Sequence, residues 1–494
     1  MFRITFAVLL LFSFTLFSAE KPNIILILVD DMGYSDLGCF GSEINTPNID
    51  KLADAGIKFT NFTNCAKCET TRTTLMSGRY HTEVKNSRSA ITIPENLAMG
   101  GYQNFMLGKW HIFDTPIQRG FDRYFGFLEG ATNFFTGVGS SGKITYRVDE
   151  KPYEIPDDFY TTTYFTKYAL KYIEERDKSK PFFMYFAHNA PHYPLQAPKE
   201  EVMKYRGKYK EGWEVLRQKR FKRMKELNII PQDMKLSEPE PDVRKWDSLS
   251  EEDRDLLDLK MATFAAMIDL VDQSVGKVVA KLKEEKIYDN TLIIFLSDNG
   301  ACPFERTKKT TIENKLMPWD PKSYHCYPKE WANACNTPWR KYKQNQNEGG
   351  ISTAMIAHWS KGIKNPGRFD RQRSHLIDFH ATFRELAGVE YPSEYKGNKI
   401  GPANGISLVP AFKGESRPEH KFLYQNFSNK YTALVVGNWK LVDKKYLYNL
   451  ENDRIESNDL SASNPDKFKE MLTMWEEKDK ELNPSGKSKK KKKN

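Results

Sequence analysis

The sequence predicts an α/β fold, in which a large mixed, mainly parallel sheet is flanked by helices and followed by a small C-terminal α+β subdomain. Unbroken apolar runs such as Asn23–Val29 are typical of central strands covered on both faces. These runs alternate with amphipathic helical patterns, the order expected of a parallel sheet. From about residue 388, short strand-like segments and one final helix replace this alternation.

The elements are expected in the following order. The strand Asn23–Val29 ends in Asp30 and Asp31, and a helix follows with Thr46 as N-cap, Pro47 in its first position and Gly56 as its stop. Further strands are expected at 57–62, 182–187 and 291–296, the last after a long amphipathic helix across 256–285. The C-terminal part should hold strands at 431–436 and 439–442 and a helix near 465–481.

Composition and charge bound the class of protein. The 494 residues are 39% hydrophobic with a formal charge of +10, of which Lys487 and the run 489–493 supply six charges. The positive charge left for the rest of the chain is small, which excludes the basic surface expected of a nucleic-acid-binding protein. Residues 1–19 have a basic start, an apolar core and a small-residue end, the pattern of a signal peptide. We therefore expect a secreted or periplasmic protein that is not an integral membrane protein.

Four regions follow. Residues 20–387 are expected to form one long α/β domain, with a charged helical insertion at 199–258 that is either a solvated helical pair or a substrate-facing rim. Residues 388–483 form the C-terminal subdomain with an antiparallel sheet and a helix, and 484–494 a disordered Lys-rich tail. Six cysteines are too few for a disulfide scaffold. Pairing among Cys302, Cys326 and Cys335 remains open, and Cys65 and Cys68 have the spacing of a redox motif.

Two strand ends carry oxygen ligands. Asp30 and Asp31 follow the first strand, and Asp298 and Asn299 follow the strand at 291–296. Adjacent buried carboxylates repel each other and lose hydration, and a hard cation removes both problems. An all-oxygen cage suits Ca²⁺ or Mg²⁺ better than zinc. The alternative is that one aspartate only caps a turn before Gly33.

Cys68 is predicted to begin a two-turn helix that stops at Gly78. At a helix N-terminus the dipole favours an anion, and Arg72, one turn later, lies on the same face. The setting would also suit a nucleophilic thiolate, and a buried structural cysteine is the ordinary alternative.

Several ordered motifs together make the chain similar to the sulfatases of the alkaline-phosphatase superfamily, and within them to bacterial arylsulfatases. They are ILVDDMGYSDLGCFG, TPNIDKLADAGIKFTNF, CETTRTTLMSGRY, LGKWH, APHYPLQAP, FLSDNGA, EGGI and the closing NWKLV and LYNL. The resemblance runs over nearly the whole mature chain and implies an alkaline-phosphatase-like fold.

The resemblance also implies a modified residue and a metal ion. A maturase would convert Cys68 to formylglycine, whose hydrate is the nucleophile; the family usually has Pro where this chain has Thr70, but Cys68 and Arg72 keep their spacing. Asp30, Asp31, Asp298 and Asn299 match the family's Ca²⁺ ligands, which formylglycine 68 completes, and Mg²⁺ is the less favoured ion.

The remaining site residues are also matched by resemblance. Arg72 would hold the formylglycine diol, Lys109 and Lys343 would contact the sulfate, and His111 lies near the diol. His192 faces the leaving oxygen and contacts the substrate. Lys341 is the alternative to Lys343, and His188 is expected to be a supporting or structural residue.

The function implied is a sulfuric ester hydrolase acting on an aryl or carbohydrate sulfate monoester, with no nucleic-acid partner. Such a reaction needs a metal ion and cations around the sulfate oxygens. Two alternatives are a phosphonate or phosphate-ester hydrolase of the same superfamily, and a non-catalytic binder of sulfated glycans.

Overall fold

The computed structural model describes residues 20–84, 86 and 88–484. The expected signal peptide, 1–19, and residues 485–494 of the expected tail lie outside this described part. Within it, no helix combines the length and apolar character needed to cross a bilayer.

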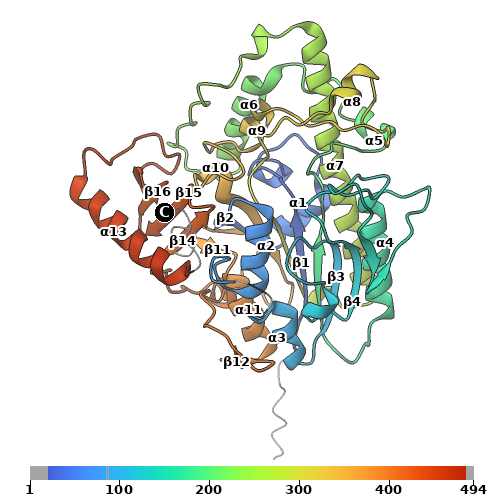
Figure 1. Ribbon diagram of the computed structural model, residues 1–494, viewed down its shortest axis with the longest axis vertical. Coiled ribbons are helices and arrows are strands. Elements are labelled where there is room, and N and C mark those ends of the chain that lie inside the picture. The colour runs from blue at the N-terminus through green and yellow to red at the C-terminus, as the bar shows by residue number, and fades with distance from the viewer. Residues whose placement is uncertain (1–19, 85, 87, 485–494) are drawn as a thin grey trace, which may run out of the picture.

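An 11-stranded mixed sheet forms the centre of the molecule (Figure 1). β9 runs antiparallel to both of its neighbours, β5 runs antiparallel to β4 and to β6 at one edge, and the remaining pairs are parallel. The predicted mixed, mainly parallel sheet is thus confirmed. In spatial order its strands are β10 (Arg368–Asp370), β2 (Ile57–Thr63), β9 (Ser352–His358), β8 (Thr291–Ser297), β1 (Asn23–Val29), β7 (Phe182–Ala187), β3 (Gln103–Lys109), β4 (Arg123–Phe127), β5 (Tyr146–Val148) and β6 (Lys151–Pro152), and β11 (Ser374–His375) also pairs with β2.

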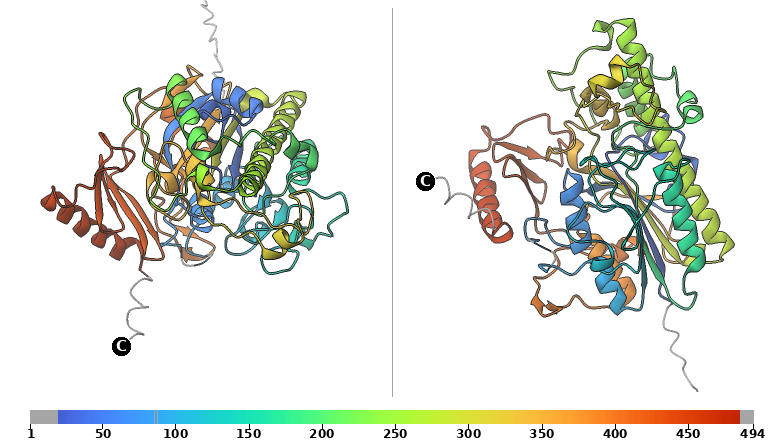
Figure 2. Two further views of the ribbon diagram at one scale, coloured as in Figure 1. Left: turned by 90° about the horizontal axis from the view of Figure 1, so that it is seen from above. Right: turned by 45° about the vertical axis from the view of Figure 1, so that its right-hand side comes forward.

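Helices cover both faces of this sheet, as Figure 2 (right) shows. Along β1, Ile25, Ile27 and Val29 enter one core, and the alternate side chains enter the other. Burying each such side chain stabilises the fold by about 1.5–3 kcal/mol. The first face carries α1 (Pro47–Asp54), α4 (Thr161–Glu175) and α7 (Glu251–Glu284), and the second α2 (Cys68–Ser77), α3 (Ile93–Met99), α11 (Asp378–Ala387) and α12 (Val409–Lys413).

The long helix α7 begins five residues earlier than its apolar pattern indicates. Ser250 caps it by accepting a hydrogen bond from the Asp253 N–H, and its first turn is acidic. Acidic side chains favour a helix N-terminus through the dipole, but they add nothing to the apolar periodicity from which the start was predicted.

The insertion at 199–258 is packed against the large α/β unit that holds the 11-stranded sheet. It contains α5 (Lys199–Met203), α6 (Gly212–Glu226) and the 3₁₀ turn η3 (Trp246–Ser248). Trp213 is buried, and the buried Arg220 is ion-paired with Asp36 and Glu43, in the segment that follows β1. The insertion is therefore anchored beside the strand end that carries the aspartates, and is not a freely solvated pair.

Short helices lie in the upper half of Figure 1, below the top of the insertion: α8 (Lys309–Glu313), α9 (Lys329–Cys335) and α10 (Glu348–Ile351). Three further 3₁₀ turns, η1 (Gly38–Phe40), η2 (Ile117–Arg119) and η4 (Tyr288–Asn290), and a small hairpin, β12 (Glu394–Tyr395) with β13 (Asn398–Lys399), connect the larger elements.

The C-terminal sheet stands beside the large α/β unit and is covered by one helix (Figures 1 and 2). Its antiparallel strands are β14 (Leu423–Phe427), β15 (Tyr431–Val436), β16 (Trp439–Val442) and β17 (Tyr446–Asn449), and the helix is α13 (Pro465–Leu482). Gln425 donates a hydrogen bond to the Asn64 carbonyl, just before α2. Lys440 is ion-paired in the interior with Glu348 and Glu456. These contacts attach the small sheet to segments near the predicted site.

Candidate active site

The two predicted pairs of oxygen ligands lie side by side. β1 and β8 are parallel neighbours, and Val29 is in register with Ser297. The residues that follow each strand therefore emerge at the same edge of the sheet. Asp30, Asp31, Asp298 and Asn299 are all buried, with at most 1% of their surface exposed. Asp31 has a left-handed backbone (φ 69°), a conformation that costs a non-glycine residue energy and is concentrated at functional sites.

Two lysines neutralise the first pair of aspartates. The Lys109 Nζ, at the end of β3, lies 2.5 Å from Asp30 Oδ2, and the Lys343 Nζ lies 2.5 Å from Asp31 Oδ1. The Asn299 amide also donates to Asp31 Oδ1, at 2.6 Å. Lys109 and Lys343 are themselves buried, so each ion pair is held in a region of low dielectric.

Arg72 links α2 to the strand ends. Its fully buried guanidinium donates to Asp298 Oδ2 from Nε (3.2 Å) and Nη2 (2.9 Å), and to the Lys109 carbonyl at 2.8 Å. α2 begins at Cys68, as predicted, and ends at Gly78 in a left-handed conformation (φ 64°). The buried Cys68 therefore stands at a helix N-terminus, one turn from Arg72.

Electrostatic coupling places Cys68 in the same site. Burial opposes the charged form of Lys343, but Asp31 and then Cys68 hold the pKa of its ammonium well above the usual value. Burial likewise opposes the charge of Arg72, yet Tyr185, Asp298, Asp30 and Cys68 raise the pKa of its guanidinium.

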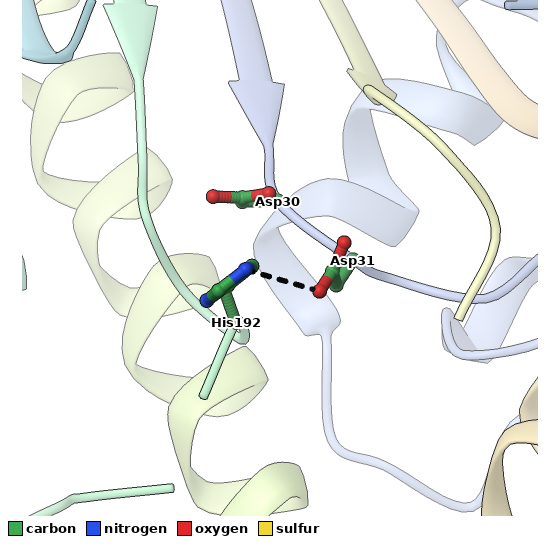
Figure 3. A group of neighbouring side chains, drawn as sticks. All are labelled: Asp30, Asp31 and His192. Carbon is green, nitrogen blue, oxygen red and sulfur yellow. Dashed lines mark ion pairs between the residues drawn. The ribbon is translucent and has the colours of Figure 1, made fainter. Parts of the chain in front are cut away.

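The oxygens around the strand ends fit a hard cation. Asp30 Oδ1, Asp31 Oδ2 and Asn299 Oδ1 are buried and accept no hydrogen bond in the described part of the chain. Each such atom costs about 1–3 kcal/mol if it remains unsatisfied. Atoms of Asp30, Asp31 and His192 lie within 4.8 Å of one another (Figure 3). Asp298 is not in that group, but its Oδ1 accepts a 3.4 Å hydrogen bond from the Asp31 N–H.

The pKa values reflect the crowding of carboxylates. Burial and the nearby Asp30 charge raise the pKa of Asp298 well above its usual value. Burial also opposes ionisation of Asp30, but Lys109, His192 and Arg72 outweigh it and hold the pKa of Asp30 well below its ordinary range. A bound cation would offset the repulsion between the Asp30 and Asp298 carboxylates.

His192 faces Asp31 with one ring nitrogen (Figure 3). Its Nδ1 lies 2.6 Å from the Tyr193 carbonyl, which can only accept, so Nδ1 carries a proton. Nε2 then points at Asp31 Oδ2 from 3.5 Å, and only a proton or a metal ion makes that contact favourable. Burial lowers the pKa of His192 to about 4, although Asp31 and Asp30 act in the opposite direction.

The other two histidines differ from His192. Burial, with the Lys109 and Arg72 cations, lowers the pKa of His111 to about 3, so its ring is neutral near pH 7. His111 packs against Gly130, where an added Cβ would lie 2.8 Å from the ring. Burial lowers the pKa of His188 to about 3, and neither of its nitrogens has a hydrogen-bond partner in the described chain. Its ring packs against Phe186 and Phe165, with centroids 4.2 and 6.3 Å away, which fits a structural role.

Comparison with known proteins identifies the family. The family model named Sulfatase matches residues 22–389. The chain belongs to the sulfatase family. An uncharacterised sulfatase of Schizosaccharomyces pombe is 32% identical, over 92% of this chain and 93% of its own. The arylsulfatase of Klebsiella aerogenes is 31% identical, over 79% of this chain and 91% of its own.

A solved structure supports the same conclusion. The structure titled Ps i-CgsB in complex with k-i-k-neocarrahexaose superposes with a TM-score of 0.68 at 27% identity, and 94% of each chain is covered. The alkaline-phosphatase-like sulfatase fold predicted from the motifs is thus confirmed, and the protein is a hydrolase of sulfate esters.

The structure distinguishes the two candidate lysines of this sulfatase. Lys343 reaches Asp31, whereas the Lys341 Nζ lies 2.5 Å from Glu240 in the insertion and is 32% exposed. The intervening backbone is irregular, with left-handed conformations at Lys341 (φ 64°) and Gln344 (φ 76°). Strand or helix periodicity therefore could not predict which lysine faces the site.

The structure answers one question that the sequence left open near the site, and it adds one residue to the site. All six cysteines are free thiols, so the pairing left open among Cys302, Cys326 and Cys335 is not formed. Cys335 lies on α9 and its carbonyl accepts from Ser35, whereas the other two line a small pocket beside Asp31. The sequence did not predict a role for Tyr185, because it lies in β7, whose sequence shows only a buried apolar run. The Tyr185 hydroxyl lies 3.4 Å from Arg72 Nη1.

Proposed function

We propose that this sulfatase cleaves a sulfate monoester of an aryl or carbohydrate substrate, using formylglycine formed from Cys68 together with a bound Ca²⁺. The carrying observation is the convergence of three buried carboxylates, three buried cations and unsatisfied oxygens around the N-terminus of α2. We also propose that the protein is secreted or periplasmic, because residues 1–19 have the composition of a signal peptide.

Asp30, Asp31, Asp298 and Asn299 would hold the metal ion. Their donor atoms are all oxygens, the set that Ca²⁺ prefers, and Mg²⁺ is the less favoured ion because it demands a stricter geometry. When bound, the ion supplies positive charge to the sulfate oxygens as a Lewis acid.

The cations of the chain would bind the sulfate group. At full ionisation, Asp30, Asp31 and Asp298 balance Arg72, Lys109 and Lys343. A dication with a singly charged sulfate ester therefore makes the site net positive, which favours negative charge on the departing oxygen. We infer that Lys109 and Lys343 donate to the sulfate oxygens.

The remaining residues would position the nucleophile and transfer protons. Formylglycine at position 68, once formed and hydrated, would supply one hydroxyl to attack sulfur; loss of the proton from its second hydroxyl would restore the aldehyde as sulfate leaves. Arg72 is fixed by Asp298 and would orient the diol. The neutral His111 can accept a proton. His192 would deliver one to the leaving oxygen from Nε2 in its doubly protonated form, since its Nδ1 is committed to the Tyr193 carbonyl; the bound sulfate ester adds negative charge that would favour this form.

Two relatives support the substrate class. The 31% identical relative from Klebsiella aerogenes is named an arylsulfatase, and the 27% identical solved structure holds a neocarrahexaose. A phosphonate or phosphate-ester hydrolase would share this site and is the competing enzyme; a sulfated-glycan binder is the non-catalytic alternative.

Mass spectrometry of residue 68 and a hydrolysis assay test the proposal together. Trypsin should release residues 68–72 from protein made in its native host, with an aldehyde in place of the thiol. That protein should hydrolyse 4-nitrophenyl sulfate faster than a phosphonate diester. The Cys68→Ala variant should not hydrolyse 4-nitrophenyl sulfate. An intact thiol in all of the active protein would refute the mechanism. A folded protein that binds sulfated glycans without hydrolysing either ester would favour the binder.

A further inference from the structure

A basic and aromatic cluster lies directly beside His192. We define it as Tyr193, Phe304, Arg306, Lys308 and Tyr324. The Tyr193 and His192 rings contact each other at a tilt of 33° with centroids 4.1 Å apart, and the Tyr324 ring centre lies 6.1 Å from that of Tyr193. Tyr193 and Phe304 line one small pocket together with Asp31. The cluster is therefore continuous with the site of the proposed reaction.

Aromatic side chains hold both cations of the cluster. Arg306 Nη1 donates to the Tyr193 hydroxyl at 2.7 Å, and its guanidinium lies 5.5 Å from the Tyr193 ring centre and 5.2 Å from that of Phe304. The Lys308 Nζ lies 4.6 Å from the Tyr324 ring centre. Such contacts fix the direction of a cation but leave its charge uncompensated.

Neighbouring acids are committed elsewhere. Glu305 is paired with Lys260 at 3.1 Å, and Glu313 with Lys309 at 3.1 Å. Within the described residues, neither Arg306 nor Lys308 forms an ion pair with a carboxylate. Both are exposed, so a ligand can reach them. The cluster thus presents two unneutralised positive charges.

The segment that carries these cations is anchored. Thr307 Oγ1 accepts a 3.0 Å hydrogen bond from the Cys326 N–H, and the Lys308 N–H donates to the Tyr324 carbonyl at 3.1 Å. The cations consequently sit on a surface held in place by the backbone of the neighbouring loop, which favours specific binding over a diffuse attraction.

We propose that Arg306 and Lys308 bind a second anionic group, a carboxylate or another sulfate, on the leaving group of the sulfate ester. The inference rests on the proposed function, because His192 is there the residue that faces the leaving oxygen. Tyr193 follows His192 in the chain and connects it to Arg306, so the cations lie on the leaving-group side. A guanidinium suits this role because its fork matches planar oxyanions.

Matched aryl sulfates test the proposal on the full-length enzyme. The substrates are 4-nitrophenyl sulfate and its analogues with a ring carboxylate or a ring sulfonate, which distinguish the two kinds of anion. We expect R306Q to lower kcat/KM about 5- to 30-fold for at least one analogue, mainly through KM, and about twofold or less for 4-nitrophenyl sulfate. K308Q should act in the same direction, R306K should retain most of the selectivity, and added salt should erode it.

Lys309→Gln is the matched control, because Lys309 lies in the same segment but is already neutralised by Glu313. Equal losses on all three substrates in R306Q would overturn the inference and assign Arg306 a positioning role through Tyr193. Unchanged kinetics in both R306Q and K308Q would overturn it as well. If the wild-type enzyme hydrolyses none of the three sulfates but cleaves a phosphonate diester, the proposed function fails instead, and the inference with it.

Discussion

Replacing Lys343 by glutamine removes one cation that we propose contacts the sulfate, with little change in side-chain volume. The Lys343 Nζ lies 2.5 Å from Asp31 Oδ1 and the side chain is almost fully buried. The glutamine amide can still donate to Asp31, and the Asn299 amide already does so at 2.6 Å. We therefore expect the variant to fold and its main defect to be the missing positive charge.

The size of that defect follows from one charged hydrogen bond. Such a bond contributes about 1.5–3 kcal/mol, so its loss from the transition state lowers kcat/KM about 10- to 150-fold. Inhibition by inorganic sulfate should weaken in the same variant, because the product occupies the same position. Initial rates with 4-nitrophenyl sulfate, at several sulfate concentrations, measure both effects.

Lys341→Gln provides the matched control. Lys341 is partly exposed and pairs with Glu240, and such pairs contribute about 0.2–1 kcal/mol. We expect its kcat/KM to stay within about fivefold of the wild type, with unchanged sulfate inhibition. Thermal unfolding of both variants shows whether each is folded, by comparing its Tm with that of the wild type. A larger loss in Lys341→Gln than in Lys343→Gln would refute the assignment of the second sulfate-binding lysine.

Three further predictions concern metal, maturation and acid stability. A chelator should abolish hydrolysis and lower Tm, and Ca²⁺ should restore both better than Mg²⁺; full activity after exhaustive chelation would contradict the site. Thr70→Pro should fold, because no hydrogen bond from the Thr70 N–H is found in the described chain and only the hydroxyl bonds to the Lys67 and Cys65 carbonyls are lost. Mass spectrometry should find residue 68 converted to formylglycine in at least as large a fraction of the variant as of the wild type. Burial lowers the pKa of His380 to about 3, so the unfolded chain takes up its proton first and stability falls as pH drops from about 6.5 toward 3. Between pH 7 and pH 5 the free energy of unfolding should therefore fall less in His380→Phe than in the wild type, by up to about 2 kcal/mol, as measured by denaturant titration. An equal fall in both proteins would contradict the argument.

Local patterns were sufficient for the elements that position the strand ends. The run Asn23–Val29, the helix after Pro47 and the helix from Cys68 have the predicted bounds to within two residues. The meeting of Asp30 with Asp298 could be anticipated because both follow strands of one parallel sheet. These predictions succeed because each depends on short-range periodicity and one topological rule.

Contacts between distant irregular segments could not be predicted in this way. The choice of Lys343 over Lys341 depends on left-handed residues in a loop, and the anchoring of Arg220 to Asp36 depends on how the insertion folds back. Tyr185 shows no polar signal in its strand, and its contact with Arg72 emerges only when α2 is placed against the sheet. Such features need tertiary structure because no local pattern encodes the partner.

The balance of six buried charges constrains how mutations at this site can be interpreted. Arg72, Lys109 and Lys343 each contact a different aspartate, so removing any one leaves a carboxylate partly uncompensated in a region of low dielectric. The remaining carboxylates would then shift toward the protonated form, which weakens metal binding as well as sulfate binding. Losses from single substitutions should consequently overlap, and the effect of two together should be smaller than the product of the separate effects. Each residue's share in catalysis is therefore defined only relative to an otherwise intact set of charges.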